Sequence, residues 1–155
     1  MTENEPIKVS DQAPDFTLKD QNENEVKLSE LKGKQVLLSF HPLAWTSVCR
    51  KQMESLEVNY GKFQELNTVP LGLSVDSVPC KKAWAADMGL EKLQILADFW
   101  PHGGVAKSLG IFIEDRGISS RANIVVDEDQ KVIFVKVYPI KELPDVQEIL
   151  KVLEE

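Results

Sequence analysis

The chain contains 155 residues, of which 43% are hydrophobic and 28% are charged. These values are typical of a single globular domain and exclude disordered and fibrous proteins. The 25 acidic side chains outnumber the 18 basic ones, which gives a formal net charge of −7, and Lys and Arg form no cluster. We therefore expect neither nucleic acid nor an anionic membrane as a partner, because both bind basic surfaces.

No targeting segment or membrane span is expected. The N-terminal sequence lacks the apolar core of a signal peptide, and no run approaches the roughly 18 apolar residues of a spanning helix. The chain is therefore predicted to be cytoplasmic. Residues 1–155 are expected to form one domain, in which residues 1–12 are a flexible polar arm.

The chain has two cysteines, Cys49 and Cys80, and two histidines, His41 and His102. A zinc site would need all four to converge, which their spacing does not suggest, so neither a metal nor a cofactor is expected. Because the cytoplasm keeps thiols reduced, we expect buried or chemically active thiols rather than a stable structural disulfide.

Short apolar runs alternate with helical periodicity in the first half of the chain. In chain order they predict a hairpin from residues 16–18 and 26–28, a strand over 36–40, a helix over 49–63, a strand over 69–75 and a helix that opens at 76–79. The strand over 36–40 is almost continuously apolar, which indicates burial on both faces. Thr46 or Ser47 can cap the first helix, which places Cys49 in its first turn.

The second half predicts further strands and helices. They are a strand over 93–96, a short helix that ends at Leu109, a hairpin from 118–126 and 131–138, and a helix that starts at Pro144. Strands separated by helices pair in parallel, whereas the last hairpin adds antiparallel strands. The predicted fold class is α/β, with a thioredoxin-like mixed central sheet, helices on both faces and an N-terminal hairpin.

Cys49 is the candidate reactive group. Unpaired backbone N–H groups and the positive end of the helix dipole favour an anion at a helix N-terminus, and this environment stabilises a thiolate. The alternative is that Cys49 is a small buried apolar residue, as free cysteines commonly are.

A permanently charged partner for this thiolate must be one of three arginines, Arg50, Arg116 or Arg121. Arg50 follows Cys49 directly and points to another face of the helix, and Arg116 lies in a turn. Arg121 opens an apolar strand, where a charge needs a partner. We therefore select Arg121, although an arginine can also extend to solvent from a strand end.

Residues 42–49 contain Pro-x-x-x-Thr-x-x-Cys at the end of a buried strand. This motif resembles the peroxidatic loop of the peroxiredoxins. The similarity continues over nearly the whole chain, including Ala-Pro-Asp-Phe-Thr-Leu at 13–18, Ser-Val-Asp at 74–76 and Asp-Phe-Trp-Pro-His-Gly-Gly at 98–104. The last segment resembles the branch of one-cysteine and atypical two-cysteine enzymes typified by alkyl hydroperoxide reductase E.

The resemblance implies a thiol-dependent peroxidase that reduces hydrogen peroxide and organic hydroperoxides. Cys49 would attack the peroxide and become a sulfenic acid. Arg121 and Thr46 would stabilise the charge that develops on the peroxide oxygens, Pro42 would close the pocket over the sulfur, and Gln52 would steady Arg121 without touching the peroxide. A homodimer is also implied.

Cys80 is the candidate resolving cysteine, by similarity to relatives that resolve within one subunit. It would form an intramolecular disulfide with Cys49, which a thioredoxin-type donor would reduce. If Cys80 is instead an apolar helix residue, the enzyme is a one-cysteine peroxidase resolved by an external thiol. A non-catalytic redox sensor or chaperone-like protein is the other alternative, whereas a dithiol oxidoreductase is disfavoured because residues 49–52 read Cys-Arg-Lys-Gln.

Overall fold

The computed structural model describes residues 5–155, in which seven strands form one mixed sheet in the order β2-β1-β5-β4-β3-β8-β9. Their bounds are β1 Thr17–Lys19, β2 Glu25–Lys27, β3 Gln35–Phe40, β4 Thr68–Ser74, β5 Gln94–Ala97, β8 Arg121–Val126 and β9 Val132–Tyr138. A separate two-stranded ribbon is formed by β6, Phe112–Ile113, and β7, Ile118–Ser119.

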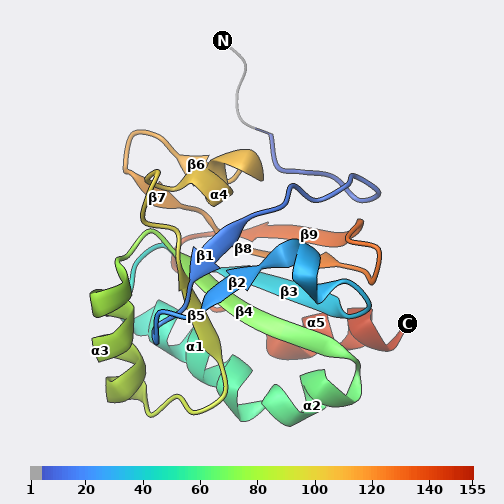
Figure 1. Ribbon diagram of the computed structural model, residues 1–155, viewed down its shortest axis with the longest axis horizontal. Helices are drawn as coiled ribbons and strands as arrows, with labels where there is room; N and C mark the ends of the chain where they lie inside the picture. The colour runs from blue at the N-terminus through green and yellow to red at the C-terminus, as the bar shows by residue number, and fades with distance from the viewer. Residues whose placement is uncertain (1–4) are drawn as a thin grey trace.

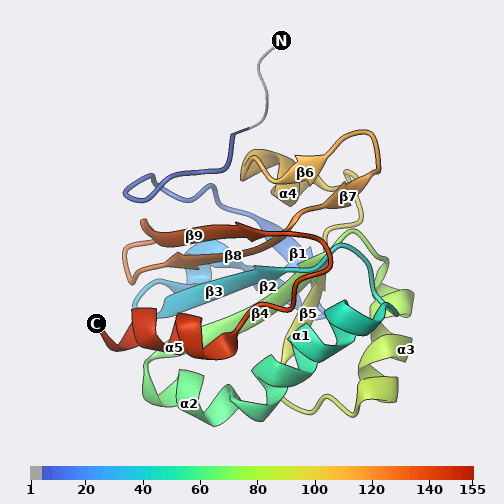
Figure 2. The same ribbon diagram turned by 180° about the vertical axis from the view of Figure 1, so that it is seen from behind.

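Helices cover both faces of the large sheet (Figures 1 and 2). One face carries α1 Ser47–Val58, α2 Tyr60–Glu65, α3 Val78–Met88 and α5 Val146–Glu154, whereas α4 Gly104–Ser108 lies with β6 and β7 on the other. A single turn of 3-10 helix, η1 Leu28–Leu31, follows β2. No helix within residues 5–155 has the length and hydrophobicity needed to cross a bilayer.

Strand pairing confirms the predicted mixed sheet. β3 pairs in parallel with β4, and β4 pairs in parallel with β5. β3 also pairs antiparallel with β8, β8 with β9, and β1 with both β2 and β5. The predicted α/β thioredoxin-like class therefore describes this structure, because helical crossovers connect the parallel strands, and hairpins connect β1 to β2 and β8 to β9.

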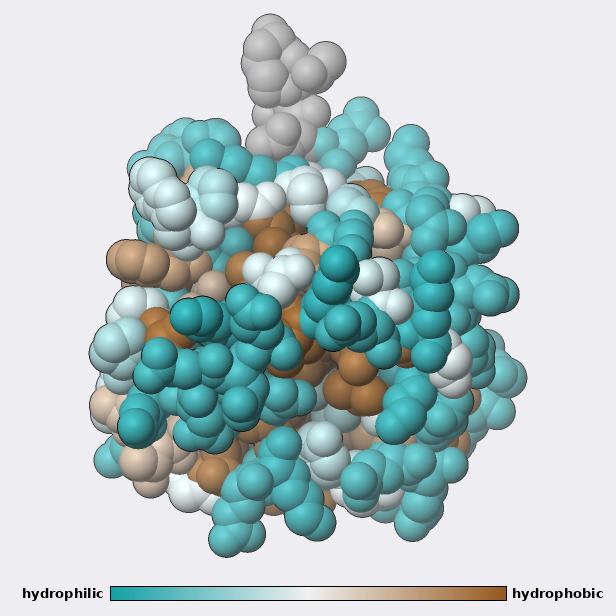
Figure 3. Space-filling model, in the orientation of Figure 1, coloured by the Kyte–Doolittle hydropathy of each residue, from teal (hydrophilic) through white to brown (hydrophobic). Residues whose placement is uncertain are grey.

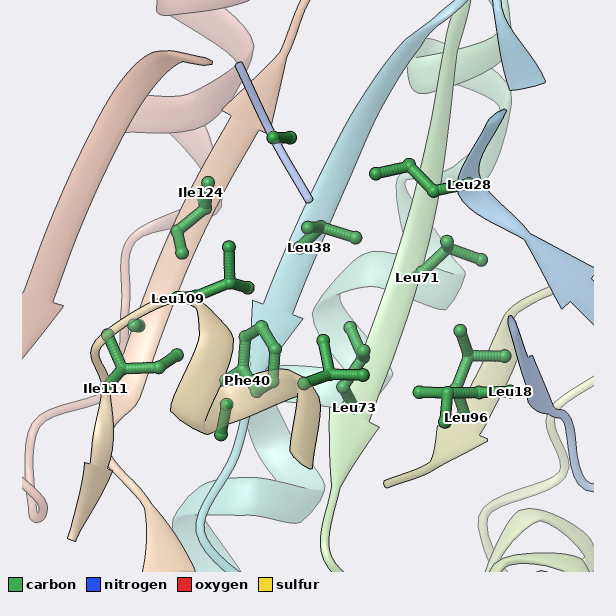
Figure 4. Packing of buried hydrophobic residues seen from close by; sticks show 14 of the residues in the cluster. Leu18, Leu28, Leu38, Phe40, Leu71, Leu73, Leu96, Leu109, Ile111 and Ile124 are labelled. Carbon is green, nitrogen blue, oxygen red and sulfur yellow. The ribbon is translucent and has the colours of Figure 1, made fainter. Parts of the chain in front are cut away.

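Two hydrophobic layers enclose the central strands. The layer under α4 contains leucines and isoleucines from β1, β3, β4, β5 and β8, with Phe40 at the end of β3 (Figure 4). The opposite layer contains Cys49, Met53 and Trp84 together with apolar residues of α5. Five of the six β3 residues are buried, as the apolar run predicts, because side chains on both faces enter a packed layer. Polar side chains cover most of the surface in Figure 3, with apolar groups visible between them.

Three local features differ from the predictions. The helix over 49–63 is two helices, because the chain turns at Asn59 between α1 and α2. The strand predicted over 118–126 is two strands. Residues 118–119 form β7 and pair with β6, whereas residues 121–126 form β8 in the large sheet.

The predicted arm over residues 1–12 also differs where it is described. Residues 1–4 lie outside the described part of the chain. Ile7 N donates to the Leu109 carbonyl at 3.0 Å, and Ser10 N donates to the Val132 carbonyl at 2.8 Å. These contacts hold this segment against the domain, a long-range packing effect that the local polar composition does not reveal.

Gly72→Ala is expected to destabilise the fold. A Cβ at this position of β4 would overlap the sulfur of Met53 and meet Ile95 at 3.0 Å, so we expect a loss of about 1–3 kcal/mol in the free energy of unfolding. The matched control is Gly61→Ala in α2, where a Cβ meets no atom within 4 Å and helix propensity predicts a gain of up to about 1 kcal/mol. Equal urea midpoints for the two variants would contradict the prediction.

Candidate active site

The loop between β3 and α1 delivers Cys49 to the first turn of α1. His41 N donates to the Leu73 carbonyl at 3.0 Å, which extends the pairing of β3 with β4 into this loop. Trp45 adopts a left-handed conformation with φ of 70°, and extended Thr46 is the N-cap residue. Cys49 is 1% exposed, and its position at the helix start favours an anionic sulfur.

Arg121 is the residue that contacts this sulfur. It opens β8, the strand beside β3, and is 2% exposed. Its Nη1 donates to Cys49 Sγ at 3.3 Å and to Gln52 Oε1 at 2.7 Å, while Nε and Nη2 donate to the Ile140 carbonyl at 2.9 and 2.7 Å. Arg121 forms no carboxylate ion pair within residues 5–155, so its charge is available to Cys49 and to a ligand.

Gln52 orients the guanidinium without neutralising it. It lies one helical turn after Cys49 on α1 and is 2% exposed. Its amide nitrogen donates to Ser39 Oγ at 2.7 Å and to the Phe40 carbonyl at 3.2 Å, which leaves Oε1 to accept from Arg121. A carboxylate at this position would cancel part of the positive charge, whereas an amide fixes the geometry and preserves it.

A pocket of about 250 Å³ opens over the sulfur. Its lining consists of the cysteine loop, the start of α1 and residues from three later segments: Pro42, Leu43, Thr46, Ser47, Val48, Cys49, Arg116, Ile118, Arg121, Ile140 and Lys141. Pro42 is buried and Thr46 is exposed. The Thr46 hydroxyl donates to the Leu43 carbonyl at 2.8 Å rather than capping α1, so its oxygen remains able to accept a further hydrogen bond.

Cys80 lies in the first turn of α3, which Ser77 caps. Its thiol is 3.9 Å from Asp76 Oδ1, and Asp76 Oδ2 accepts from Ala44 N at 2.8 Å in the Cys49 loop. Burial, followed by the Asp76 charge, raises the pKa of the Cys80 thiol. Both cysteines are free thiols, and Cys80 is not part of the pocket lining.

The structure thus brings five of the six predicted site residues to one place and leaves Cys80 beside it. The residues that the sequence did not reveal are the Ile140 carbonyl, which anchors Arg121, and the cationic side chains Arg116 and Lys141 at the pocket lining. A backbone carbonyl has no sequence signal. The sequence places Arg116 only in a turn, because nothing local indicates that this turn reaches the pocket.

Peroxiredoxins are defined by a cysteine at the start of the helix that follows a central strand of a thioredoxin-like sheet. In this class an arginine from a neighbouring strand contacts the cysteine sulfur, as it does here. The chain belongs to the AhpC/TSA family, whose model matches residues 9–135. The predicted membership of the peroxiredoxins is therefore confirmed.

Relatives and solved structures agree with this class. Alkyl hydroperoxide reductase E of Mycobacterium tuberculosis is 38% identical over 140 residues, which cover 90% of this chain and 91% of that protein. The reduced 2-Cys peroxiredoxin of Plasmodium vivax is 29% identical with a TM-score of 0.86 over 96% of this chain and 81% of that one. The peroxidoxin BcpB structure of M. tuberculosis is 27% identical with a TM-score of 0.83 over 96% and 97%. The chain is thus a thiol-dependent peroxidase of the alkyl hydroperoxide reductase E-like branch.

Proposed function

We propose that Cys49 is the peroxidatic cysteine of this peroxidase and reduces hydrogen peroxide and organic hydroperoxides. The observation that carries the proposal is the 3.3 Å contact between Arg121 Nη1 and Cys49 Sγ at the floor of an accessible pocket. A cation beside a thiolate favours the ionised, nucleophilic form of the sulfur. The apolar pocket lining also accommodates the carbon chain of an alkyl hydroperoxide.

The reaction is a displacement at oxygen. The Cys49 thiolate attacks the terminal peroxide oxygen, so an S–O bond forms while the O–O bond breaks. The released alkoxide or hydroxide takes up a proton to give an alcohol or water, and Cys49 becomes a sulfenic acid. Arg121 and backbone N–H groups at the start of α1 donate to the two oxygens as negative charge moves between them, and the Thr46 oxygen accepts from a protonated peroxide oxygen. Pro42 shields the sulfur from bulk water.

Gln52 acts through Arg121 rather than on the peroxide. Its bonds to Ser39 and Phe40 tie the guanidinium to β3, the strand that precedes the cysteine loop. Positioned donors contribute most when they need no reorganisation during the reaction. We therefore assign Gln52 a positioning role.

We further propose that Cys80 resolves the sulfenic acid within one chain. The Cys80 thiolate would attack Cys49 sulfur, forming an S–S bond and breaking the S–O bond, and the departing hydroxide would leave as water with the Cys80 proton. Asp76, 3.9 Å from this thiol, can take up that proton and pass it to the hydroxide. Disulfide geometry requires Cα atoms within about 7 Å, so the first turn of α1 would unwind during this step.

Treatment of the reduced protein with one equivalent of hydrogen peroxide tests the role of Cys80. We expect a monomer whose intact mass falls by two hydrogens, and we expect Cys80→Ser to gain one oxygen on Cys49 instead. A stable oxygen adduct in the unmodified chain would support the one-cysteine alternative, and a covalent dimer on a non-reducing gel would show resolution between subunits.

The catalytic cycle is completed by an external thiol reductant. We propose a thioredoxin-type donor, a cytoplasmic location and a homodimer, as the resemblance of the sequence to the peroxiredoxins implies. Peroxide consumption measured with thioredoxin and its reductase tests the proposal. Turnover is expected with the complete system, whereas oxidation limited to one equivalent per chain would indicate another donor, and no oxidation at all would contradict the proposed function.

A further inference from the structure

Lys81 and His41 form a buried pair of basic side chains that the mechanism above does not use. Both are 0% exposed. Lys81 Nζ lies 2.8 Å from His41 Nε2, and within residues 5–155 the Lys81 ammonium group has no other hydrogen-bond partner and no ion pair. Trp84 packs against both groups, 5.2 Å from the His41 ring and 5.8 Å from Lys81 Nζ.

The position of this pair links it to the cysteine. His41 directly precedes Pro42 at the end of β3, and Lys81 directly follows Cys80 in α3. Trp84 packs in the same hydrophobic cluster as Cys49. The pair therefore lies inside the domain beside the loop whose outer surface forms the pocket.

The charges that face Lys81 come from α1, from α3 and from the segments that follow β4 and β5. Burial lowers the pKa of Lys81 to about 7, against the attraction of Asp76, Cys80, Cys49 and Asp98. Other donors already engage both carboxylates. Asp76 accepts from the Cys49 loop and from Ser74, and Asp98 accepts from the first N–H groups of α4. Within residues 5–155 Lys81 forms no ion pair with either carboxylate, so its ammonium group attracts the Cys49 sulfur as well as Asp76 and Cys80.

His41 is the neutral member of the pair. Burial, followed by the charges of Lys81 and Arg121, lowers the pKa of His41 well below its usual value. The unprotonated Nε2 accepts a hydrogen bond from the ammonium, so the pair carries at most one positive charge. Burying an ammonium group with one neutral acceptor costs folding free energy. The stability of this region therefore does not explain why a lysine occupies position 81.

We propose that Lys81, held by His41, is a positioning residue whose ammonium group acts together with Arg121 to keep Cys49 ionised. The proposal rests on the assignment of Cys49 as the reactive thiol. Guanidinium groups keep their charge over the accessible pH range, whereas a pKa of about 7 means that the Lys81 ammonium loses its proton as the pH rises through neutrality. Arg121 therefore contributes to the reactivity of Cys49 at every pH, whereas Lys81 contributes only in acidic and neutral solution.

Lys81→Met tests this inference through the pH profile of Cys49 alkylation by iodoacetamide, followed on the Cys49 peptide by mass spectrometry. At pH 6 we expect alkylation about tenfold slower than in the unmodified chain, the effect of one nearby opposite charge. At pH 8.5 the two rates should agree within about twofold, because Lys81 is neutral there. Lys82→Met, an exposed neighbour on the same helix, is expected to match the unmodified chain at both pH values.

Equal alkylation rates for Lys81→Met and the unmodified chain at pH 6 would overturn the inference. A decrease of the same size at pH 6 and pH 8.5 would also overturn it, because a purely structural role of Lys81 predicts a loss that does not depend on pH. The proposed function is judged separately, since Lys81→Met should still consume peroxide at pH 8.5 and alkylation uses no peroxide.

A second measurement does not depend on a Lys81 variant that folds. In protein labelled with carbon-13 at lysine Cε, the Lys81 resonance is expected to titrate near pH 7. Cys49→Ser removes an anion that stabilises the ammonium, so reciprocity predicts that the titration midpoint moves to lower pH. An unchanged midpoint would show that the two groups do not interact and would overturn the inference.

Discussion

Cys49→Ser is expected to abolish peroxide consumption at every pH and with every thiol donor. The serine hydroxyl is un-ionised at neutral pH and cannot form a sulfenic acid, so the step that breaks the O–O bond has no nucleophile. The comparison is informative because the substitution changes one buried atom, and the hydrogen bonds of Arg121 to Gln52 and Ile140 remain available. Peroxide loss is measured after rapid mixing. Mass spectrometry of the protein then shows whether an oxygen atom has been added to it.

Cys80→Ser is the matched control, since it removes the other thiol of the chain. It is expected to undergo the first oxidation at the rate of the unmodified protein and to lose only the disulfide. If Cys49→Ser consumed peroxide and Cys80→Ser did not, the assignment of the two cysteines would be reversed. If both retained full turnover, the thiol mechanism itself would be contradicted for this chain.

Arg121→Ala is expected to slow the oxidation of Cys49 by about 10²- to 10³-fold, the effect of removing a preorganised donor to a developing negative charge. Arg121→Lys should recover part of the rate, because it restores the charge but cannot reproduce the bonds to Gln52 and the Ile140 carbonyl. The rate constant is measured by stopped-flow mixing with hydrogen peroxide in single turnover, so that resolution and recycling do not contribute.

Arg50→Ala is the control for loss of an arginine near the cysteine. Arg50 follows Cys49 directly but pairs with Glu54 at 3.0 Å and with Asp87 at 2.5 Å on the helix surface, and we expect less than about a twofold change in rate. Unfolding in urea identifies any Arg121 variant that fails to fold. A well-folded Arg121→Ala protein with an unchanged rate would show that the 3.3 Å contact to the sulfur has no catalytic effect.

The sequence alone determines the framework of this protein. The apolar run of β3 predicts a strand buried on both faces, and the alternation of strands and helices followed by a hairpin predicts the mixed sheet. These are local patterns of hydrophobicity and turn residues, which the chain carries whatever surrounds it. The same reasoning places Cys49 in a first helical turn and singles out Arg121, because a charge that opens an apolar strand needs a partner.

Only the tertiary structure decides how these residues act together. The Ile140 carbonyl reaches Arg121 across 19 residues of chain, and the Lys81 ammonium reaches His41 across 40. A lysine in a helix and a histidine after a strand have ordinary local patterns, and their burial follows from the packing of α3 against the sheet. Burial changes the charge of Lys81 near neutral pH, and local sequence cannot encode this effect because desolvation depends on every neighbouring element.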